Sequence, residues 1–447
     1  MAMTMSGLAA TGVLNRLNKN ENARGKNLKT LASGLKIGGA EDDASGYAIS
    51  KRMSVQIRSL EQDSQNAQNG TSLIKTAGEA LQSTVDILKT LKEKAIDAAN
   101  DSNTDSDRAN IQKEVDQAFD QIDDNANTTY NGQRMLDGSR NNEVVYPGSH
   151  TYLTNDQLAD DTEAISRIIN LKSKNGLSLN IVPGDTIEVS YVKNGVTYSN
   201  LDNKDGRLPQ PIVVTKKTRF SAILGWDPAR TDLDIQHYSH TSKIGTDQYG
   251  NDVYTPDGKN AISYHSAYPG VENQIAGLTI TVYDANGHKR NSANNALNHF
   301  EESIRAQDPS EDCAMRFQIG TKSNQATTFG FEDMRSSALG LRGSAGNTVQ
   351  LTTRRSAAAA INVFDNAVKK VLDQQTELGA FQDRLLFTYN NIKTSQENTI
   401  ASQSTIADAN MAKEATEFAK NNVLTQSAQA MLAQANQSVS SVLSLLQ

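Results

Sequence analysis

The residues best suited to metal or acid–base chemistry are few and scattered. His237 and His240 stand three apart in "IQHYSH", a spacing that would place two imidazoles on one face of a helix. Their neighbours are typical of a strand or loop, and no further ligand cluster is evident, so surface histidines are the better interpretation. The segment "NHFEES" around His299 lacks the HExxH pattern of zinc peptidases.

Two other features could suggest chemistry, and both have a simpler interpretation. Asp42 and Asp43 are adjacent carboxylates, but "GGAEDDASG" is typical of a loop followed by a helix N-terminus, where acidic side chains favour the helix dipole. Cys313 is the single cysteine, which excludes an intrachain disulfide and a cysteine-based zinc cage. We therefore expect no enzymatic activity, no metal site and no cofactor.

The composition limits the partners. A net charge of −7 lacks the basic footprint of a nucleic-acid-binding protein. No run of about 18 apolar residues is present, so we expect no membrane-spanning segment. Hydrophobic residues make up 37% of the chain, below the usual share of about 45–50%, which indicates that part of the chain lacks a thick core.

The distribution of proline divides the chain into three parts. All eight prolines lie between Pro147 and Pro309, and none occurs in residues 1–146 or 310–447. Because proline disrupts helix interiors, both ends are expected to be helical. The middle carries strand and turn signals, including the Asn194-Gly195 and Asn286-Gly287 dipeptides, and "MRFQIGTKSNQATTFGFEDMRSSALGL" predicts a further hairpin.

Apolar residues recur along both arms at alternating spacings of four and three. This spacing predicts long antiparallel helices that pack as a coiled-coil-like bundle, with an α+β, β-rich domain inserted between them. In the first arm a second helix follows the loop "DSNTDSD", which is dense in residues that cap helices. The predicted seam consists of Met53, Ile57, Leu60, Ile74, Leu81, Leu88, Ile111, Val115, Phe364, Val368 and Leu385.

A stripe of apolar residues lies at the C-terminal end of the chain, and the residues around it are almost all uncharged. A lone helix cannot bury it: full burial of its ten apolar residues would yield about 10–25 kcal/mol, whereas ordering roughly 25 residues costs about 1–2 kcal/mol each. The N-terminal segment is a candidate partner, and other copies of the chain must cover what remains. The sequence thus predicts that the N-terminal and C-terminal segments fold when copies of the chain associate. The residues in question are Leu14, Leu17, Leu28, Leu31, Leu424, Met431, Leu432, Val439, Val442, Leu443 and Leu446.

Several long segments resemble the bacterial flagellins. In the first arm these are "TLASGLKIGGAEDDASGYAISKRM", "NAQNGTSLIKTAGEAL", "IQKEVDQAFDQID" and "TYNGQRMLDGS". In the second they are the hairpin segment quoted above, "LGAFQDRLLFTYNNI", "ADANMAKEATEFAKNNVLTQSAQAMLAQANQ" and "SVLSLL". The resemblance covers about residues 1–140 and 315–447 and is collinear at both ends, whereas residues 141–312 resemble no family that we can name.

The resemblance implies a layout and a function. Residues 1–45 and 401–447 would form the inner tube of a filament, 46–140 and 313–400 the outer tube, and 141–312 a variable surface domain. The chain would be a secreted, extracellular structural subunit that polymerises with itself into the flagellar filament for swimming. It would be exported unfolded by the type III apparatus and would meet an export chaperone, hook-associated proteins and the cap protein. A hook–filament junction protein and a flagellin with an enzymatic insertion are the alternatives.

One surface deserves comparison within that family. In many flagellins an innate immune receptor reads the region that corresponds to "ILKTLKEKAID", through an arginine and a leucine. Here Thr90 and Lys94 stand at those positions, while Glu114 retains the acidic residue of the next helix. Because threonine lacks the paired donors of arginine, we expect weak receptor activation.

Overall fold

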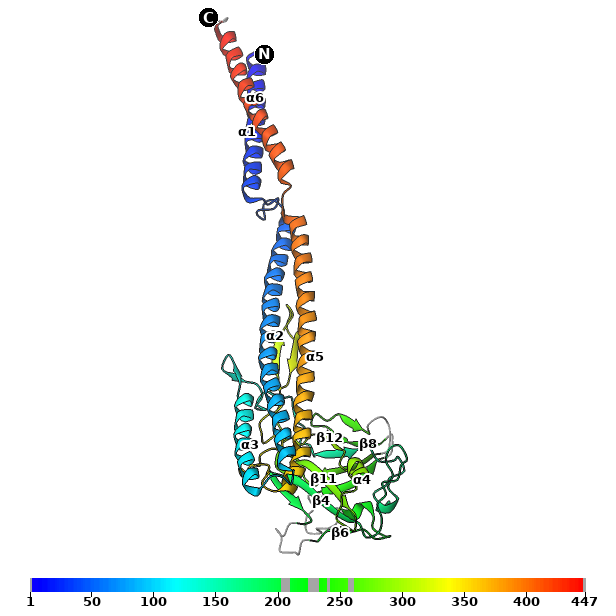
Figure 1. Ribbon diagram of the computed structural model, residues 1–447. Helices are drawn as coiled ribbons and strands as arrows, with labels where there is room; N and C mark the ends of the chain where they lie inside the picture. Colours follow the sequence, from blue (N-terminus) through cyan, green and yellow to red (C-terminus); the bar gives the residue numbers. More distant parts are fainter. Residues whose placement is uncertain (1, 202–209, 224–232, 239–241, 256–260, 445–447) are drawn as a thin grey trace. The chain divides into compact units, whose positions relative to one another are not determined.

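The computed structural model describes residues 2–201, 210–223, 233–238, 242–255 and 261–444. In the first and last helices, the side chains are described only from Thr11 onward and up to Gln437. Its long helices all lie in the two arms, as the proline distribution predicted (Figure 1). They are α1 (Ala2–Ser33), α2 (Ala44–Ala98), α3 (Asp105–Ala126), α5 (Arg354–Ala407) and α6 (Met411–Ser444). The chain divides into two compact units, and α2 and α5 contribute residues to both. The first unit contains Met1–Gln68, Gln318–Gln325 and Phe387–Gln447, and the second contains Asn69–Phe317 and Ala326–Leu386.

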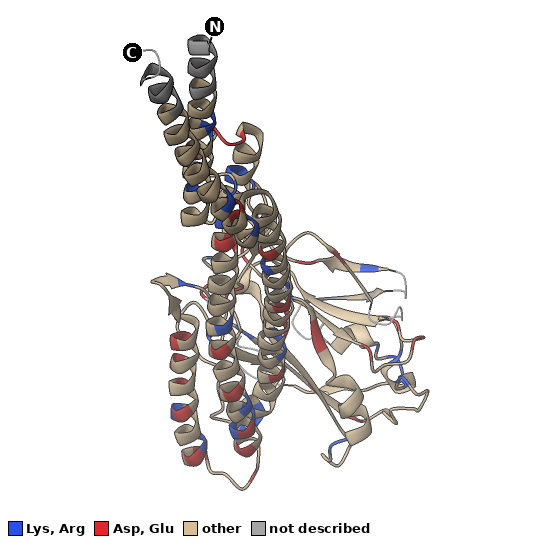
Figure 2. Cartoon of the chain, turned by 90° about the horizontal axis from the view of Figure 1, so that it is seen from above, with Lys and Arg blue, Asp and Glu red and all other residues tan. Residues whose placement is uncertain are grey.

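The first unit is built around α1 and α6, which lie side by side and antiparallel (Figure 1). Gly34 ends α1 with a φ of 72°, a conformation that glycine adopts without steric cost. The backbone N–H of Lys36 then donates to the carbonyl of Ala407 at 2.7 Å, and that of Ala409 donates to the carbonyl of Gly34 at 2.9 Å. These bonds join the loop after α1 to the last residue of α5 and to the loop before α6. Beyond Lys420, α6 carries no charged residue, and the described residues of this last part of the helix are tan in Figure 2.

The second unit contains a helical core. The loop rich in capping residues ends at Thr104, whose hydroxyl accepts from the N–H of Asp107 while the Asp107 carboxylate accepts from the N–H of Thr104. This capping box starts α3 as the sequence indicated. Phe119 of α3 and Phe364 of α5 are fully buried, with ring centroids 6.3 Å apart.

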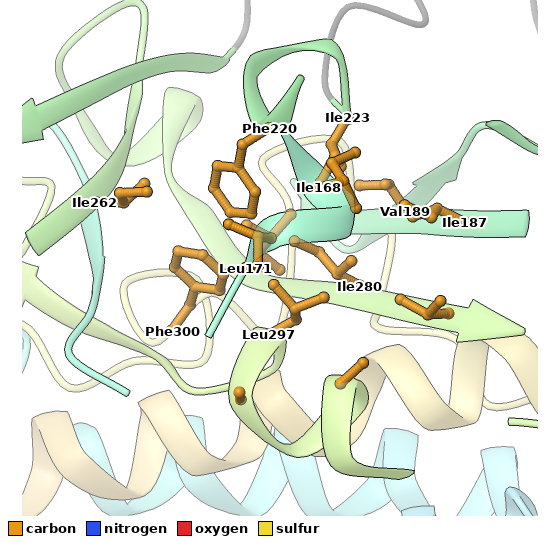
Figure 3. Close-up of a cluster of buried hydrophobic side chains, with 14 of the residues drawn as sticks. Ile168, Leu171, Ile187, Val189, Phe220, Ile223, Ile262, Ile280, Leu297 and Phe300 are labelled. Atoms are coloured by element: carbon orange, nitrogen blue, oxygen red, sulfur yellow. The ribbon is translucent and has the colours of Figure 1, made fainter. Parts of the chain in front are cut away.

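The inserted region forms two principal antiparallel sheets, of order β12-β3-β10-β7 and β11-β4-β5, with β6 paired to β4. Figure 3 shows side chains from both sheets and from α4 meeting in one core, including Ile262, Ile280 and Leu297. The mainly helical ends and the β-rich insertion match the predicted fold class. The strands of these sheets, with α4, are β3 (Tyr152–Asn155), β4 (Thr186–Lys193), β5 (Val196–Ser199), β6 (Ile212–Val213), β7 (Leu233–Tyr238), β10 (Ala261–Ser266), β11 (Ile275–Tyr283), α4 (Asn291–Leu297) and β12 (Phe300–Ile304).

The predicted turns are confirmed. Asn194 and Gly195 join β4 to β5 with φ values of 50° and 70°, as a type I′ turn requires. Asn286-Gly287 forms the tip of an exposed loop after β11, closed by a bridge between Tyr283 and Lys289. The remaining short strands pair as hairpins: β1 (Thr129–Tyr130) with β2 (Gln133–Arg134), β8 (Lys243–Thr246) with β9 (Asp252–Tyr254), and β13 (Met315–Gln318) with β14 (Ala326–Phe329).

Candidate assembly surfaces

The contact between α1 and α6 is narrow. On α6, Thr425 and Ala428 are buried, and other residues spaced alternately four and three apart are half-buried. That spacing is the pattern of a coiled-coil seam. The half-buried residues are Glu414, Phe418, Asn421, Leu432 and Ala435 on α6, and Val13, Leu17, Asn20, Arg24, Asn27 and Leu31 on α1.

Six large apolar side chains of this helix pair are between 41% and 62% exposed. They are Leu14 and Leu28 of α1 and Met411, Val423, Leu424 and Met431 of α6. The predicted terminal stripe is therefore split in this unit: Leu17, Leu31 and Leu432 are half-buried in the seam, whereas Leu14, Leu28, Leu424 and Met431 are exposed. Leu446 and the side chains of Val439, Val442 and Leu443 lie outside the described residues.

The predicted seam of the long helices lies inside the units. Met53 and Ile57 are half-buried in the first unit, where Leu60 is buried, and Val368 is half-buried in the second. The other members are all buried in the second unit: Ile74, Leu81, Leu88, Ile111, Val115, Phe364 and Leu385.

Gly70 marks the place in the second unit where three elements meet. A Cβ at Gly70 would lie 3.0 Å from Phe317 of β13 and 3.3 Å from Leu385 of α5. The rings of Phe317 and Phe329 both contact Phe381 of α5, with centroids 5.7 and 4.7 Å away. The absence of a side chain on α2 thus lets the β13–β14 hairpin and α5 approach this helix closely.

The insertion is bonded to α5 along strand β11, which forms the edge of its sheet. The amide of Asn362 donates to the carbonyl of Leu278 at 3.0 Å, and that of Asn366 donates to the carbonyl of Ala276 at 2.9 Å. Both residues lie one turn apart on α5. Their side chains supply partners to backbone groups that an open sheet edge would leave unpaired.

Two buried ion pairs lie in the same unit, and the first of them also joins the insertion to α5. Lys370 of α5 lies 3.1 Å from Glu302 of β12, and their side chains are only 4% and 6% exposed. Arg305 pairs with Glu332 nearby. Burial lowers the pKa of Lys370, although the charge of Glu302 acts in the opposite direction. A cavity of about 440 Å³ lies beside the two pairs. The sequence prediction missed Lys370, Asn362 and Asn366; polar side chains that interrupt an apolar helix face were the available signal.

The three residues compared with the receptor-facing surface lie on α2 and α3. Lys94 forms an ion pair with Glu114 at 2.6 Å, and this contact raises the pKa of Lys94. Thr90 is exposed and donates to the carbonyl of Asp86 at 3.1 Å. This surface therefore presents a lysine whose charge is paired with a carboxylate, and a short hydroxyl side chain.

The residues considered for chemistry have structural roles where they are described. Asp43 accepts from the N–H groups of Ser45 and Gly46 at the start of α2, which confirms the predicted helix N-terminus. Asp42 pairs with Lys26 at 3.2 Å. Within the described residues, no three His, Cys, Asp or Glu side chains are grouped to hold a metal, and no helix is long and apolar enough to cross a membrane. The side chain of His237 and the whole of His240 lie outside the description.

Comparison with known proteins identifies the arms. Residues 7–141 match the model of the bacterial flagellin N-terminal helical region, and residues 361–446 match that of the C-terminal helical region. A flagellin of Clostridium tyrobutyricum is 32% identical over 433 residues, covering 96% of this chain and 98% of its own. A Bacillus subtilis flagellin is 29% identical over 443 residues, covering 98% of each chain.

Among solved structures, FliC from Burkholderia pseudomallei is similar over 70% of this chain and 99% of its own, with 17% identity and a TM-score of 0.26. The family assignment rests on the sequence matches, which span both arms and nearly the full length of the relatives. The chain belongs to the bacterial flagellin family.

Proposed function

We propose that this chain is a structural subunit that polymerises into the bacterial flagellar filament, and that α1 and α6 carry contacts between subunits. The observation behind this proposal is the set of six exposed apolar side chains on the α1–α6 pair. Exposed large apolar side chains that gather on one element are typical of a surface that another molecule covers. Contacts between different surfaces of identical subunits generate an open helical polymer.

The thinness of the helix pair supports folding of the tips on assembly. Among the described side chains of α1 and α6, only Thr30, Thr425 and Ala428 are buried. Burial of two threonines and one alanine offsets little of the roughly 1–2 kcal/mol per residue that ordering the backbone costs. Neighbouring copies would supply the missing apolar contacts, so the tips become ordered as each subunit docks.

The layout expected from the family is part of the proposal. Residues 1–45 and 401–447 would form the inner tube, 46–140 and 313–400 the outer tube, and 141–312 the variable surface domain. Export of the unfolded chain, an export chaperone and contacts with hook-associated and cap proteins follow from the same family membership. The subunit is proposed to have no enzymatic activity of its own.

Weak recognition by an innate immune receptor is a separate element of the proposal. Lys94 is held by Glu114, and Thr90 offers one short hydroxyl where an arginine would offer several donors. Both features reduce the contacts available to a receptor that, in other flagellins, binds an arginine and a leucine at these positions.

Electron microscopy tests the proposed assembly. The purified chain, raised to high concentration, is expected to form filaments, whereas a chain without residues 422–447 is not. Met431→Ser, which removes an exposed apolar side chain, is expected to reduce filament yield, while Gln429→Ser on the same helix should not. Filaments of normal yield from the shortened chain would refute the assignment of subunit contacts to α6.

A further inference from the structure

The seam between α1 and α6 combines apolar side chains with polar ones. Asn20, Asn27 and Asn421 are half-buried in the seam, whereas Leu28 and Met431 are more than half exposed outside it. The hydrophobic effect alone favours apolar side chains at seam positions, because they would remove more apolar area from water. The polar residues in the seam therefore call for a specific interaction between the two helices.

Three side chains in the seam supply such an interaction. The Asn27 amide donates through Nδ2 to Oε2 of Glu414 at 2.9 Å, and its Oδ1 accepts from Nδ2 of Asn421 at 3.2 Å. Glu414 and Asn421 are seven residues apart, so they project from the same face of α6, two turns from each other. Asn27 reaches both only when that face of α6 is turned toward α1.

We propose that Asn27, Glu414 and Asn421 form a lock that sets the rotation of α1 against α6 and so keeps the apolar side chains outward. The inference rests on the proposed function, because those side chains are kept free for neighbouring subunits. A polar residue in a helix seam lowers stability but specifies how the helices pair. A rotated pair would lose both hydrogen bonds of Asn27, including the one to the charged carboxylate of Glu414, which disfavours it.

Removing the lock provides the test. In a Cys313→Ser background, spin labels are attached to cysteines at the exposed positions Lys19 and Gln426, and labelled chains are diluted with unlabelled ones. Asn27→Leu with Asn421→Leu is expected to let the leucines pair within one chain. The soluble double variant should then show a narrow label-to-label distance where the soluble parent shows a broad distribution. Its filaments should grow at least tenfold more slowly than those of the labelled parent.

A single variant separates the lock from general effects on the seam. Asn20→Leu makes the seam more apolar without touching the three residues, and it is expected to grow at the parental rate. Parental growth by the double variant, with the parental distance in its filaments, would overturn the lock. Equal slowing by Asn20→Leu would also overturn it. Failure of the parent itself to polymerise would instead refute the proposed function.

Discussion

The ion pair between Lys370 and Glu302 provides a sharp test of how the insertion is attached to α5. The substitution Glu302→Gln removes the negative partner and leaves an ammonium group whose side chain is only 4% exposed. Loss of one member of a buried ion pair costs about 3–5 kcal/mol, because the remaining charge stays desolvated. The adjacent cavity of about 440 Å³ admits water, and glutamine retains an acceptor, so we expect the lower end of that range.

Thermal unfolding of the full-length chain measures the effect. At about 2–4 °C per kcal/mol, a loss of about 3 kcal/mol lowers the Tm of the second unit by roughly 6–12 °C. Near-ultraviolet circular dichroism follows this transition, because the aromatic cores of the unit lose their packing when it unfolds.

The neighbouring residue supplies the control. Glu301 pairs with Lys369 at 2.7 Å, but these side chains are 53% and 41% exposed. An exposed pair contributes about 0–1 kcal/mol, so Glu301→Gln should leave the Tm nearly unchanged. The double variant Lys370→Met with Glu302→Leu removes both buried charges and should recover most of the loss. Equal shifts from Glu301→Gln and Glu302→Gln would refute the reasoning.

Three further predictions follow from other residues. Burial raises the pKa of Asp63, so the folded chain binds its proton more tightly than the unfolded one; the contribution of Asp63 to the free energy of unfolding should fall as the pH rises above about 4, and the difference in unfolding free energy between the parent and Asp63→Asn should change accordingly in denaturant titrations. Phe119→Ala should cost about 3–5 kcal/mol in the same titrations, whereas Phe387→Ala, at 75% exposed, should cost under about 1 kcal/mol; similar losses would contradict the assigned core. Thr90→Arg with Lys94→Leu should strengthen the dose–response on receptor-bearing cells, and a full-strength response from the unaltered chain would argue against weak recognition.

Local features could be predicted wherever one residue type has one strong conformational preference. The hairpin at Asn194-Gly195 was predictable because few other dipeptides accept two positive φ angles. The helical arms were predictable because proline is absent from them, and the cap at Thr104 because Asp107 follows at the spacing of a capping box.

Features that depend on distant residues were not predictable. Periodicity placed Leu424 and Leu432 on one broad stripe, but it gives only the angle between side chains on a helix and not the direction of a partner. The structure puts Leu432 in the seam and leaves Leu424 exposed. The bond from Asn362 to Leu278 spans 84 residues, and nothing in either local sequence specifies it.

The attachment of the insertion to α5 decides where a foreign peptide could be displayed on this protein. Excising residues 141–312 to make room for an epitope would remove the partners of Asn362 and Lys370. It would also expose the face of α5 that the insertion now covers. The loop at Asn286-Gly287 offers a better graft point: a Cβ at Gly287 would meet no atom within 4 Å, and residues 285–289 are exposed. A peptide inserted there would leave the bonds of Asn362, Asn366 and Lys370 to the insertion intact.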